Sequence, residues 1–193
     1  MSPLSRRLFL ASIAASLFGL ARNRVSRSYP NWTTDDVDRV LTDSPWAKPT
    51  TVAVPELRGE IYLTIRWATA LPVRQAFAIQ QSKAPETIEI AEPEYVIEIA
   101  GFPTTLIRKG TSRFKAELTE SARLTVPGRR SSKPVSAYVP EHGMHLMATL
   151  RFPKFEGLDA KEGDVTLHAA SGSLKVDQRF KLKDMIYDGR LEL

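Results

Sequence analysis

The sequence predicts a mainly β protein: a single antiparallel β-sandwich, Ig-like or similar, with two or three short helices. Three observations support this fold class. About eight short segments alternate apolar and polar residues, as half-buried strands do. Turn signals containing Pro, Gly or Asp-Gly separate these segments. The chain shows no internal repeat and no second core, so we expect one β-rich domain over residues 32–193.

The first 21 residues, MSPLSRRLFLASIAASLFGLA, have the layout of a signal peptide. Arg6 and Arg7 give a positive start, an uncharged apolar run follows over 8–20, and small residues end it. The run is shorter than the roughly 17–25 residues of a membrane span, and no later segment is long and apolar enough to span. We expect a cleaved signal peptide at 1–21 and a flexible linker at 22–31.

Residues 5–10, SRRLFL, resemble the twin-arginine export motif, with Arg6, Arg7, Phe9 and Leu10 at matching positions. The next residue is Ala where that motif usually has Lys. The resemblance implies contact with the export machinery, export in the folded state and a periplasmic or secreted protein. An uncleaved amphipathic helix is the alternative, but the apolar residues are continuous rather than striped.

Composition narrows the chemistry that the chain can perform. It has no cysteine, which excludes disulfides, thiolate metal sites and a cysteine nucleophile. The leader contains two Arg and no acidic residue, so its removal lowers the net charge from +5 to +3. A charge of this size is ordinary for a soluble protein. We therefore expect no nucleic-acid partner.

The first element after the linker is expected to be a short helix. Thr33 can cap it, Asp36 lies at the third helical position, and the apolar residues of 37–41 form one side. The helix should end before Pro45. Trp46 lies in an extended segment between two prolines. We expect it to dock on the core and fix the next strand; an aromatic ligand platform is the alternative.

The middle of the chain alternates predicted strands and helices. Residues 60–67 have the pattern of a half-buried strand. Residues 72–81 begin with Pro and contain good helix formers, which favours a short helix over a strand. A loop or edge segment is expected over 82–93 and a strand over 95–100. The pattern of 104–121 fits both a helix and a twisted strand.

The second half of the chain is predicted to be mostly strands. Short strands are expected at 124–126, 134–139 and 146–152, with RRSSK at 129–133 as a basic solvated turn and a loop at 153–163.

The clearest predicted element is a hairpin over 165–182 that turns at Ser171-Gly172. Its outer face has a basic stripe formed by Lys175, Arg179, Lys181 and Lys183. Such a stripe promotes solubility and protects a sheet edge; the functional alternative is binding of acidic envelope polymers or phospholipid headgroups. Asp188-Gly189 predicts one last turn.

The sequence EHGMHLM at 141–147 is the best candidate for chemistry. His142, Met144, His145 and Met147 combine imidazole and thioether groups, which suit copper. The alternative is a turn that enters a strand, with Met filling gaps in the core. No other cofactor is expected.

Two other groups of residues are candidates for a catalytic role. His168 shares the outer face of its predicted strand with Asp164 and Thr166, but Gly-x-Ser-x-Gly and phosphate-binding loop motifs are absent. Glu94 and Glu98 lie on one strand face, as a glycosidase pair or, more commonly, as a solvated face. No catalytic residue is assigned.

Two stretches, SPWAK at 44–48 and FKLKDMIYDGRLEL at 180–193, resemble the ends of a family of uncharacterised exported proteins from soil bacteria of the acidobacterial type. The segment 67–77, an aromatic strand followed by Pro-Val-Arg, resembles that family too. The resemblance implies one compact domain with ordered ends and no particular activity.

The function that these observations favour is a non-enzymatic exported β-sandwich that binds an envelope protein or polymer, or has a structural role in the envelope. A periplasmic copper-binding protein is the alternative, and a hydrolase with an unrecognised site is the second alternative.

Overall fold

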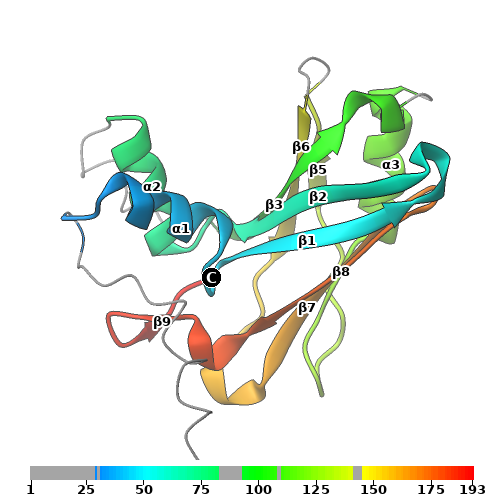
Figure 1. The fold of residues 1–193 in the computed structure, drawn as a ribbon. Coiled ribbons are helices and arrows are strands. Elements are labelled where there is room, and N and C mark those ends of the chain that lie inside the picture. Colours follow the sequence, from blue (N-terminus) through cyan, green and yellow to red (C-terminus); the bar gives the residue numbers. More distant parts are fainter. Residues whose placement is uncertain (1–28, 30, 83–92, 108–109, 141–144) are drawn as a thin grey trace, which may run out of the picture.

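The computed structural model describes residues 29, 31–82, 93–107, 110–140 and 145–193 (Figure 1). The predicted export signal, with Arg6, Arg7, Phe9 and Leu10, lies outside the described residues, as does most of the predicted 82–93 segment. In the part of the chain that is described, no helix is long and apolar enough to cross a membrane.

In the part of the chain that is described, two larger antiparallel sheets, one two-stranded sheet and three α-helices form the fold, which confirms the predicted mainly β class. The larger sheet has the order β1-β2-β3-β6-β5, and its strands are β1 (Ala47–Val54), β2 (Gly59–Trp67), β3 (Glu94–Pro103), β6 (His145–Pro153) and β5 (Ser136–Tyr138). The smaller sheet has the order β4-β7-β8, and its strands are β4 (Arg123–Thr125), β7 (Asp164–Ser171) and β8 (Leu174–Lys181). The short strands β9 (Ile186–Tyr187) and β10 (Arg190–Leu191) pair with each other. The helices are α1 (Thr34–Thr42), α2 (Leu71–Gln80) and α3 (Thr111–Ser121).

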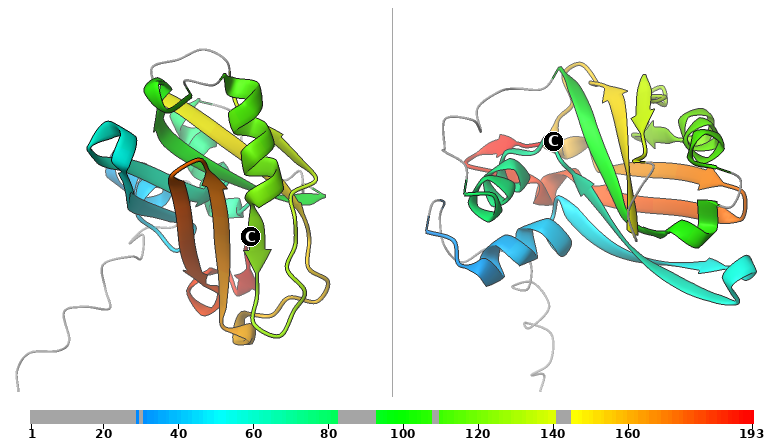
Figure 2. Two further views of the ribbon diagram at one scale, coloured as in Figure 1. Left: turned by 90° about the vertical axis from the view of Figure 1, so that its right-hand side faces the viewer. Right: turned by 90° about the horizontal axis from the view of Figure 1, so that it is seen from above.

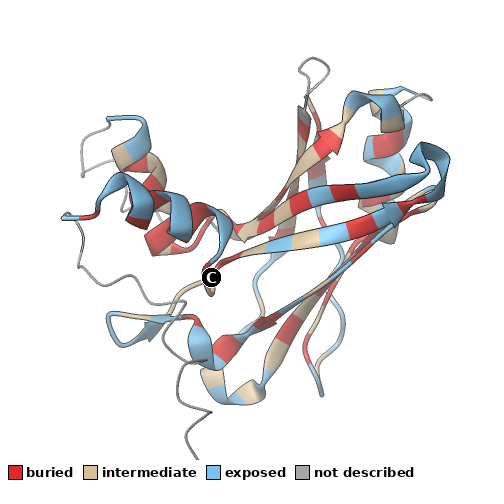
Figure 3. Cartoon of the chain, in the orientation of Figure 1, coloured by how far each residue is buried: buried red, intermediate tan, exposed pale blue. Residues whose placement is uncertain are grey.

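One hydrophobic core lies between the two sheets, because inward-facing residues alternate along every long strand (Figure 3). On β2 the inward residues Ile61 to Trp67 are at most 7% exposed, as the sequence pattern predicted. The rings of Trp67 and Phe180 meet edge to face at 5.9 Å and join β2 to β8. Such aromatic pairs contribute about 0.5–1.5 kcal/mol beyond the area that they bury.

The edges of the two sheets meet at β1 and β8 (Figure 1). No ladder of backbone hydrogen bonds joins them among the described residues; instead Thr50 Oγ1 donates a hydrogen bond to Gln178 Oε1. The sandwich is therefore closed along this side by side chains rather than by strand pairing.

A capping box fixes the start of α1, as predicted. The Asp36 backbone N–H donates to Thr33 Oγ1 at 3.2 Å, and the Thr33 N–H donates to Asp36 Oδ2 at 3.0 Å. Helices α1 and α2 pack side by side at one end of the larger sheet, and α3 lies at its other end (Figure 1). Of the ambiguous segment 104–121, residues 111–121 are α-helical and 104–107 form a 3-10 helix.

Trp46 docks on the core, as predicted, and is 6% exposed. Its Nε1 donates to the carbonyl oxygen of Glu192 at 2.9 Å, and its ring meets Tyr187 edge to face. The C-terminal segment is therefore packed beside the start of β1.

A bulge in β3 depends on glycine. The β3–β6 register shifts between Ala100 and Phe102, and Gly101 between them has φ +106°. A Cβ atom at this position would lie 2.5 Å from the carbonyl oxygen of Tyr62 on β2. No other residue fits here without displacing the strand, because both the φ angle and the close approach require glycine.

Candidate functional site

The predicted metal cluster falls largely on residues that the structure does not describe. His142 and Met144 lie outside the described residues, and of His145 only the backbone at the start of β6 is described. Met147 is half-buried on the outer face of β6, opposite Ala100 of β3. The described residues contain no group of three or more His, Asp or Glu that could hold a metal ion. Copper binding remains a prediction.

The outer face of the smaller sheet is open to solvent (Figure 2). Antiparallel pairing puts Arg123, His168 and Asp177 in one row across it and Thr125, Thr166 and Arg179 in the next. We call this surface the basic face; it comprises the cations Arg123, Lys175, Arg179 and Lys181, interspersed with Asp164 and Asp177. Lys183 was predicted on the same face, but β8 ends at Lys181 and Lys183 lies in the 3-10 turn that follows. The four cations from 175 to 183 are exposed, as the predicted stripe required.

Both acids of the basic face have partners. Asp164 lies 3.5 Å from the Arg179 guanidinium, and Asp177 is hydrogen-bonded to His168 Nδ1. No ion pair engages Lys175, Lys181 or Lys183 within the described part of the chain. Lys175 and Lys181 thus project from the face, and Lys183 lies in the turn beyond it, with no ion pair among the described residues.

His168 links two strands in an arrangement that resembles a catalytic triad. Its Nδ1 meets Asp177 on β8, and its Nε2 lies 3.2 Å from Thr125 Oγ1 on β4. The sequence predicted His168 on the outer face, where it lies, but did not indicate its contacts with Asp177 and Thr125. Because the hairpin turns at Ser171-Gly172, the sequence alone predicts that position 177 lies opposite position 168. No local sequence pattern predicts that Thr125 of β4 lies beside His168.

The surroundings of this histidine do not favour catalysis. The His168 and Asp177 side chains are 45% and 66% exposed, and neither cavity described below includes them. Water therefore competes for every hydrogen bond, whereas catalytic groups gain strength from a site that excludes water. In this setting the three side chains act as a cross-strand polar contact.

The expected solvated face at Glu94 and Glu98 is wrong for Glu98. Its carboxylate lies 2.9 Å from Arg66 Nε on β2, and the two side chains are 14% and 13% exposed. The Phe77 ring of α2 stacks on the Arg66 guanidinium with its centroid 5.1 Å away. Burial raises the pKa of Glu98, and Arg66 opposes that shift. Glu94 instead lies near Arg151 at 3.6 Å, so the two carboxylates belong to separate ion pairs.

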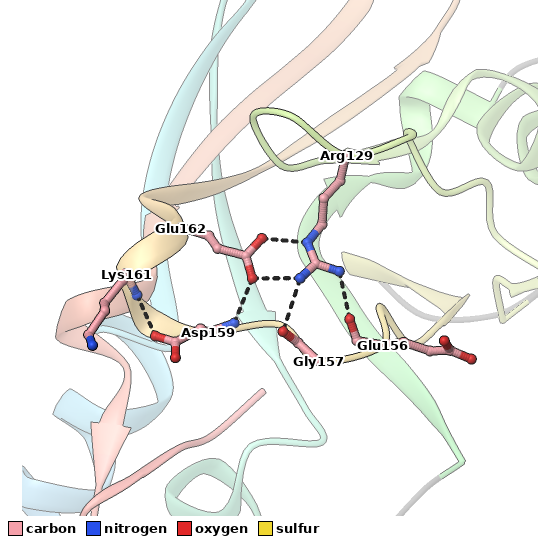
Figure 4. Close-up of polar contacts among 6 residues, drawn as sticks. All are labelled: Arg129, Glu156, Gly157, Asp159, Lys161 and Glu162. Carbon is pink, nitrogen blue, oxygen red and sulfur yellow. Dashed lines mark hydrogen bonds and ion pairs between the residues drawn. The ribbon is translucent and has the colours of Figure 1, made fainter.

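Arg129 also departs from the expected solvated turn, because it binds the loop between β6 and β7 (Figure 4). Its guanidinium forms a two-point ion pair with Glu162 and donates to the carbonyl oxygens of Glu156 at 2.6 Å and Gly157 at 3.0 Å. This hydrogen bonding lowers the pKa of Glu162. The neighbouring Arg130 and Lys133 are exposed, as expected for a turn.

At least two cavities are formed by described residues. The hairpin cavity, about 220 Å³, lies between the β7–β8 turn, the start of α3 and the turns that follow β1 and β3. It is lined by Glu56, Leu57, Thr105, Leu106, Gly110, Arg113, Phe114, Glu117 and Ser171 to Leu174. A more polar cavity of about 450 Å³ lies beside the C-terminal segment and includes Thr69, Tyr95, Lys154 and Glu192. Sequence patterns signalled neither, because each joins four or more distant segments.

The described residues thus define an antiparallel β protein with an open basic face and two cavities. Comparison with models of protein families, with curated proteins and with solved structures found no match.

Proposed function

We propose that the protein is an exported, non-catalytic β-sandwich that binds the anionic headgroups of a lipid surface through the basic face. The observation that carries this proposal is the placement of four cations and two already partnered acids on one outer sheet face. Export rests on the leader sequence, which predicts a periplasmic or secreted protein that meets the cell envelope.

The shape of the basic face favours a lipid surface over an acidic polymer. The cations project from a sheet rather than lining a groove, and neither described cavity includes any of them. A planar array of headgroups contacts such a face all at once, whereas a single polymer strand gains from a groove that surrounds it. Adjacent side chains on one face of a strand are about 6.8 Å apart, so several cations reach the headgroup layer together.

The strength of this binding follows from the charge. Each Lys or Arg near an anionic membrane contributes about 1 kcal/mol, and the two acids offset part of that. A net charge near +2 on this face gives roughly 2 kcal/mol, or about a 30-fold enrichment at the surface. Binding should therefore be weak, reversible and sensitive to salt.

Cosedimentation with vesicles tests the proposal. The protein should bind phosphatidylcholine vesicles that contain phosphatidylglycerol and should not bind vesicles of phosphatidylcholine alone. Binding should disappear in 1 M salt, where the screening length falls to about 3 Å. Combined Lys175→Glu and Lys181→Glu substitutions should abolish binding. Arg39→Glu with Arg130→Glu changes the net charge equally at exposed positions outside the basic face and should preserve most of it.

Two results would contradict the proposal. One is equal loss of binding in both double variants, which would show that net charge alone is responsible. The other is capture by polyglutamate without vesicle binding, which would point to an acidic polymer. Circular dichroism of each variant confirms that a loss of binding is not a loss of fold.

The alternative hypotheses have less support. Copper binding rests on a cluster of which only Met147 has a described side chain, and metal analysis of the purified protein tests it. The contact of Thr125 and Asp177 with His168 is the one observation that favours a hydrolase. Ester hydrolysis that persists unchanged in Thr125→Val would remove that support.

A further inference from the structure

The hairpin cavity has one wall rich in hydrogen-bond acceptors. Ser171 Oγ donates to Glu117 Oε2 at 2.7 Å, and Ser173 Oγ donates to a carboxylate oxygen of Glu56. Both serines thus direct their protons at carboxylates, and their oxygens can still accept hydrogen bonds. The turn residue Gly172 separates the two serines, so both hydroxyl oxygens are held by the β7–β8 hairpin.

The first turn of α3 supplies donors. Gly110 lines the cavity and is the N-cap of α3, and among the described residues no side chain caps the first turn of this helix. The first N–H groups of a helix lack partners within it and carry partial positive charge. Arg113 adds a guanidinium whose Nε donates to Glu117 Oε1 at 2.7 Å. The helix start and this arginine therefore face a ligand as donors.

The floor of the cavity is apolar and rigid. Phe114 is 5% exposed and Leu174 is 2% exposed, and both belong to the hydrophobic core. The Phe114 ring meets Phe102 edge to face at 5.1 Å. An apolar floor with a few convergent polar groups is the usual form of a small-molecule site.

Charge decides which class of ligand fits. Arg113 and Glu117 form an ion pair, and the partial positive charge at the start of α3 offsets part of the charge of Glu56, so the lining has little net charge with which to hold an ion. A neutral molecule with several hydroxyl groups both donates and accepts, and its C–H faces pack on an apolar floor. We infer that the hairpin cavity binds a neutral polyhydroxyl ligand of the size of a single sugar ring. This inference is independent of the basic face.

Nuclear magnetic resonance of the ¹⁵N-labelled protein tests this inference. Glucose, galactose and N-acetylglucosamine are each titrated to millimolar concentrations. At least one should cause saturable shifts of the Gly110, Ser171 and Gly172 amide signals. A trisaccharide of the bound sugar distinguishes a free ring from the end of a longer chain, since tighter binding indicates the latter.

Two matched variants on α3 locate the site. Glu117→Gln should weaken binding at least about tenfold, because hydrogen bonds to charged groups contribute more than neutral ones. Glu120→Gln, on the same helix but outside the cavity, should bind as the wild type does. The spectra themselves report folding, and Ser173→Ala replaces Glu117→Gln if that variant unfolds.

Three outcomes would overturn the inference: no saturable shift with any sugar, equal binding in Glu117→Gln or its replacement, or stronger shifts at the same amides with methylammonium or acetate. The last would show that the cavity takes a charged ligand.

Discussion

Burial in the fold deprives the Glu98 carboxylate of most of its hydration. Its carboxylate is taken out of water together with the Arg66 guanidinium, beneath the Phe77 ring. Burial raises the pKa of Glu98 although the positive charge beside it acts in the other direction. Desolvation therefore outweighs the attraction of the ion pair, as it often does for buried pairs.

This balance predicts the pH dependence of stability. A raised pKa means that the folded state binds more protons than the unfolded state between the ordinary value for Glu, about 4.3, and the raised value. The contribution of this carboxyl group is therefore present below pH 4 and is lost as the pH rises through the pKa in the folded state. Since Glu98→Gln resembles the protonated form, it should match the wild type in acid and become the more stable of the two at neutral pH.

Urea unfolding from acid to neutral pH measures this difference, with Glu120→Gln as the control for a general change in charge. A wild type that gains stability over Glu98→Gln as the pH rises would mean that the ion pair outweighs desolvation.

The sequence predicted part of this residue-scale picture. Alternation along 94–99 correctly placed Glu94 and Glu98 on one face, because strand periodicity depends on local residues only. It could not indicate that Arg66 pairs across to Glu98 or that Phe77 of α2 packs on Arg66. Those contacts depend on sheet register and helix packing, which join segments far apart in sequence.

At the scale of elements, Arg129 connects two loops. It lies in the β4–β5 connection and binds the β6–β7 loop through Glu162 and two backbone carbonyls. Glu162 also accepts the Asp159 N–H at 2.9 Å in the capping box of a short 3-10 turn, Ala160–Glu162. One guanidinium thus satisfies backbone groups that a surface loop would otherwise leave to water.

Removal of this side chain should release the loop. We expect Arg129→Ala to be cleaved by trypsin after the exposed Lys154 or Lys161 several-fold faster than the wild type, because the loop loses its tertiary hydrogen bonds. Arg130→Ala removes the exposed neighbouring arginine and should leave the rate unchanged. Mass spectrometry of the fragments identifies the cleaved bond. Equal rates in the two variants would show that the loop is held by its own turns.

Elements whose pattern lies in consecutive residues were predicted well, whereas the contacts of Arg129 with a distant loop were not. Helix α1 has its capping box and apolar side in consecutive residues, and the β7–β8 hairpin has its turn and alternation there too. In RRSSK at 129–133 nothing local distinguishes Arg129 from Arg130, since the partners of Arg129 lie about 30 residues away. The hairpin cavity was missed for the same reason.

At the scale of the whole molecule, the C-terminal segment ties the helical end to the sheets. Glu192 accepts the Trp46 Nε1–H through its backbone carbonyl and the Leu71 N–H at the start of α2 through its carboxylate. Tyr187 donates its hydroxyl proton to Gln75 of α2 at 2.9 Å. Because these contacts join one continuous core, we expect the domain to unfold in a single transition.

Trp46→Phe tests this cooperativity. The substitution removes the hydrogen bond to Glu192 and leaves space in the core, so it should cost about 1–3 kcal/mol of unfolding free energy. Tyr62→Phe, at a ring that is 77% exposed, should change it by less than about 0.5 kcal/mol. In both variants, unfolding followed by fluorescence and by far-ultraviolet circular dichroism should coincide. An earlier fluorescence transition in Trp46→Phe would contradict this expectation. It would mean that the C-terminal segment and β1 separate from the rest before the sheets unfold, so that the two sheets do not share one cooperative core.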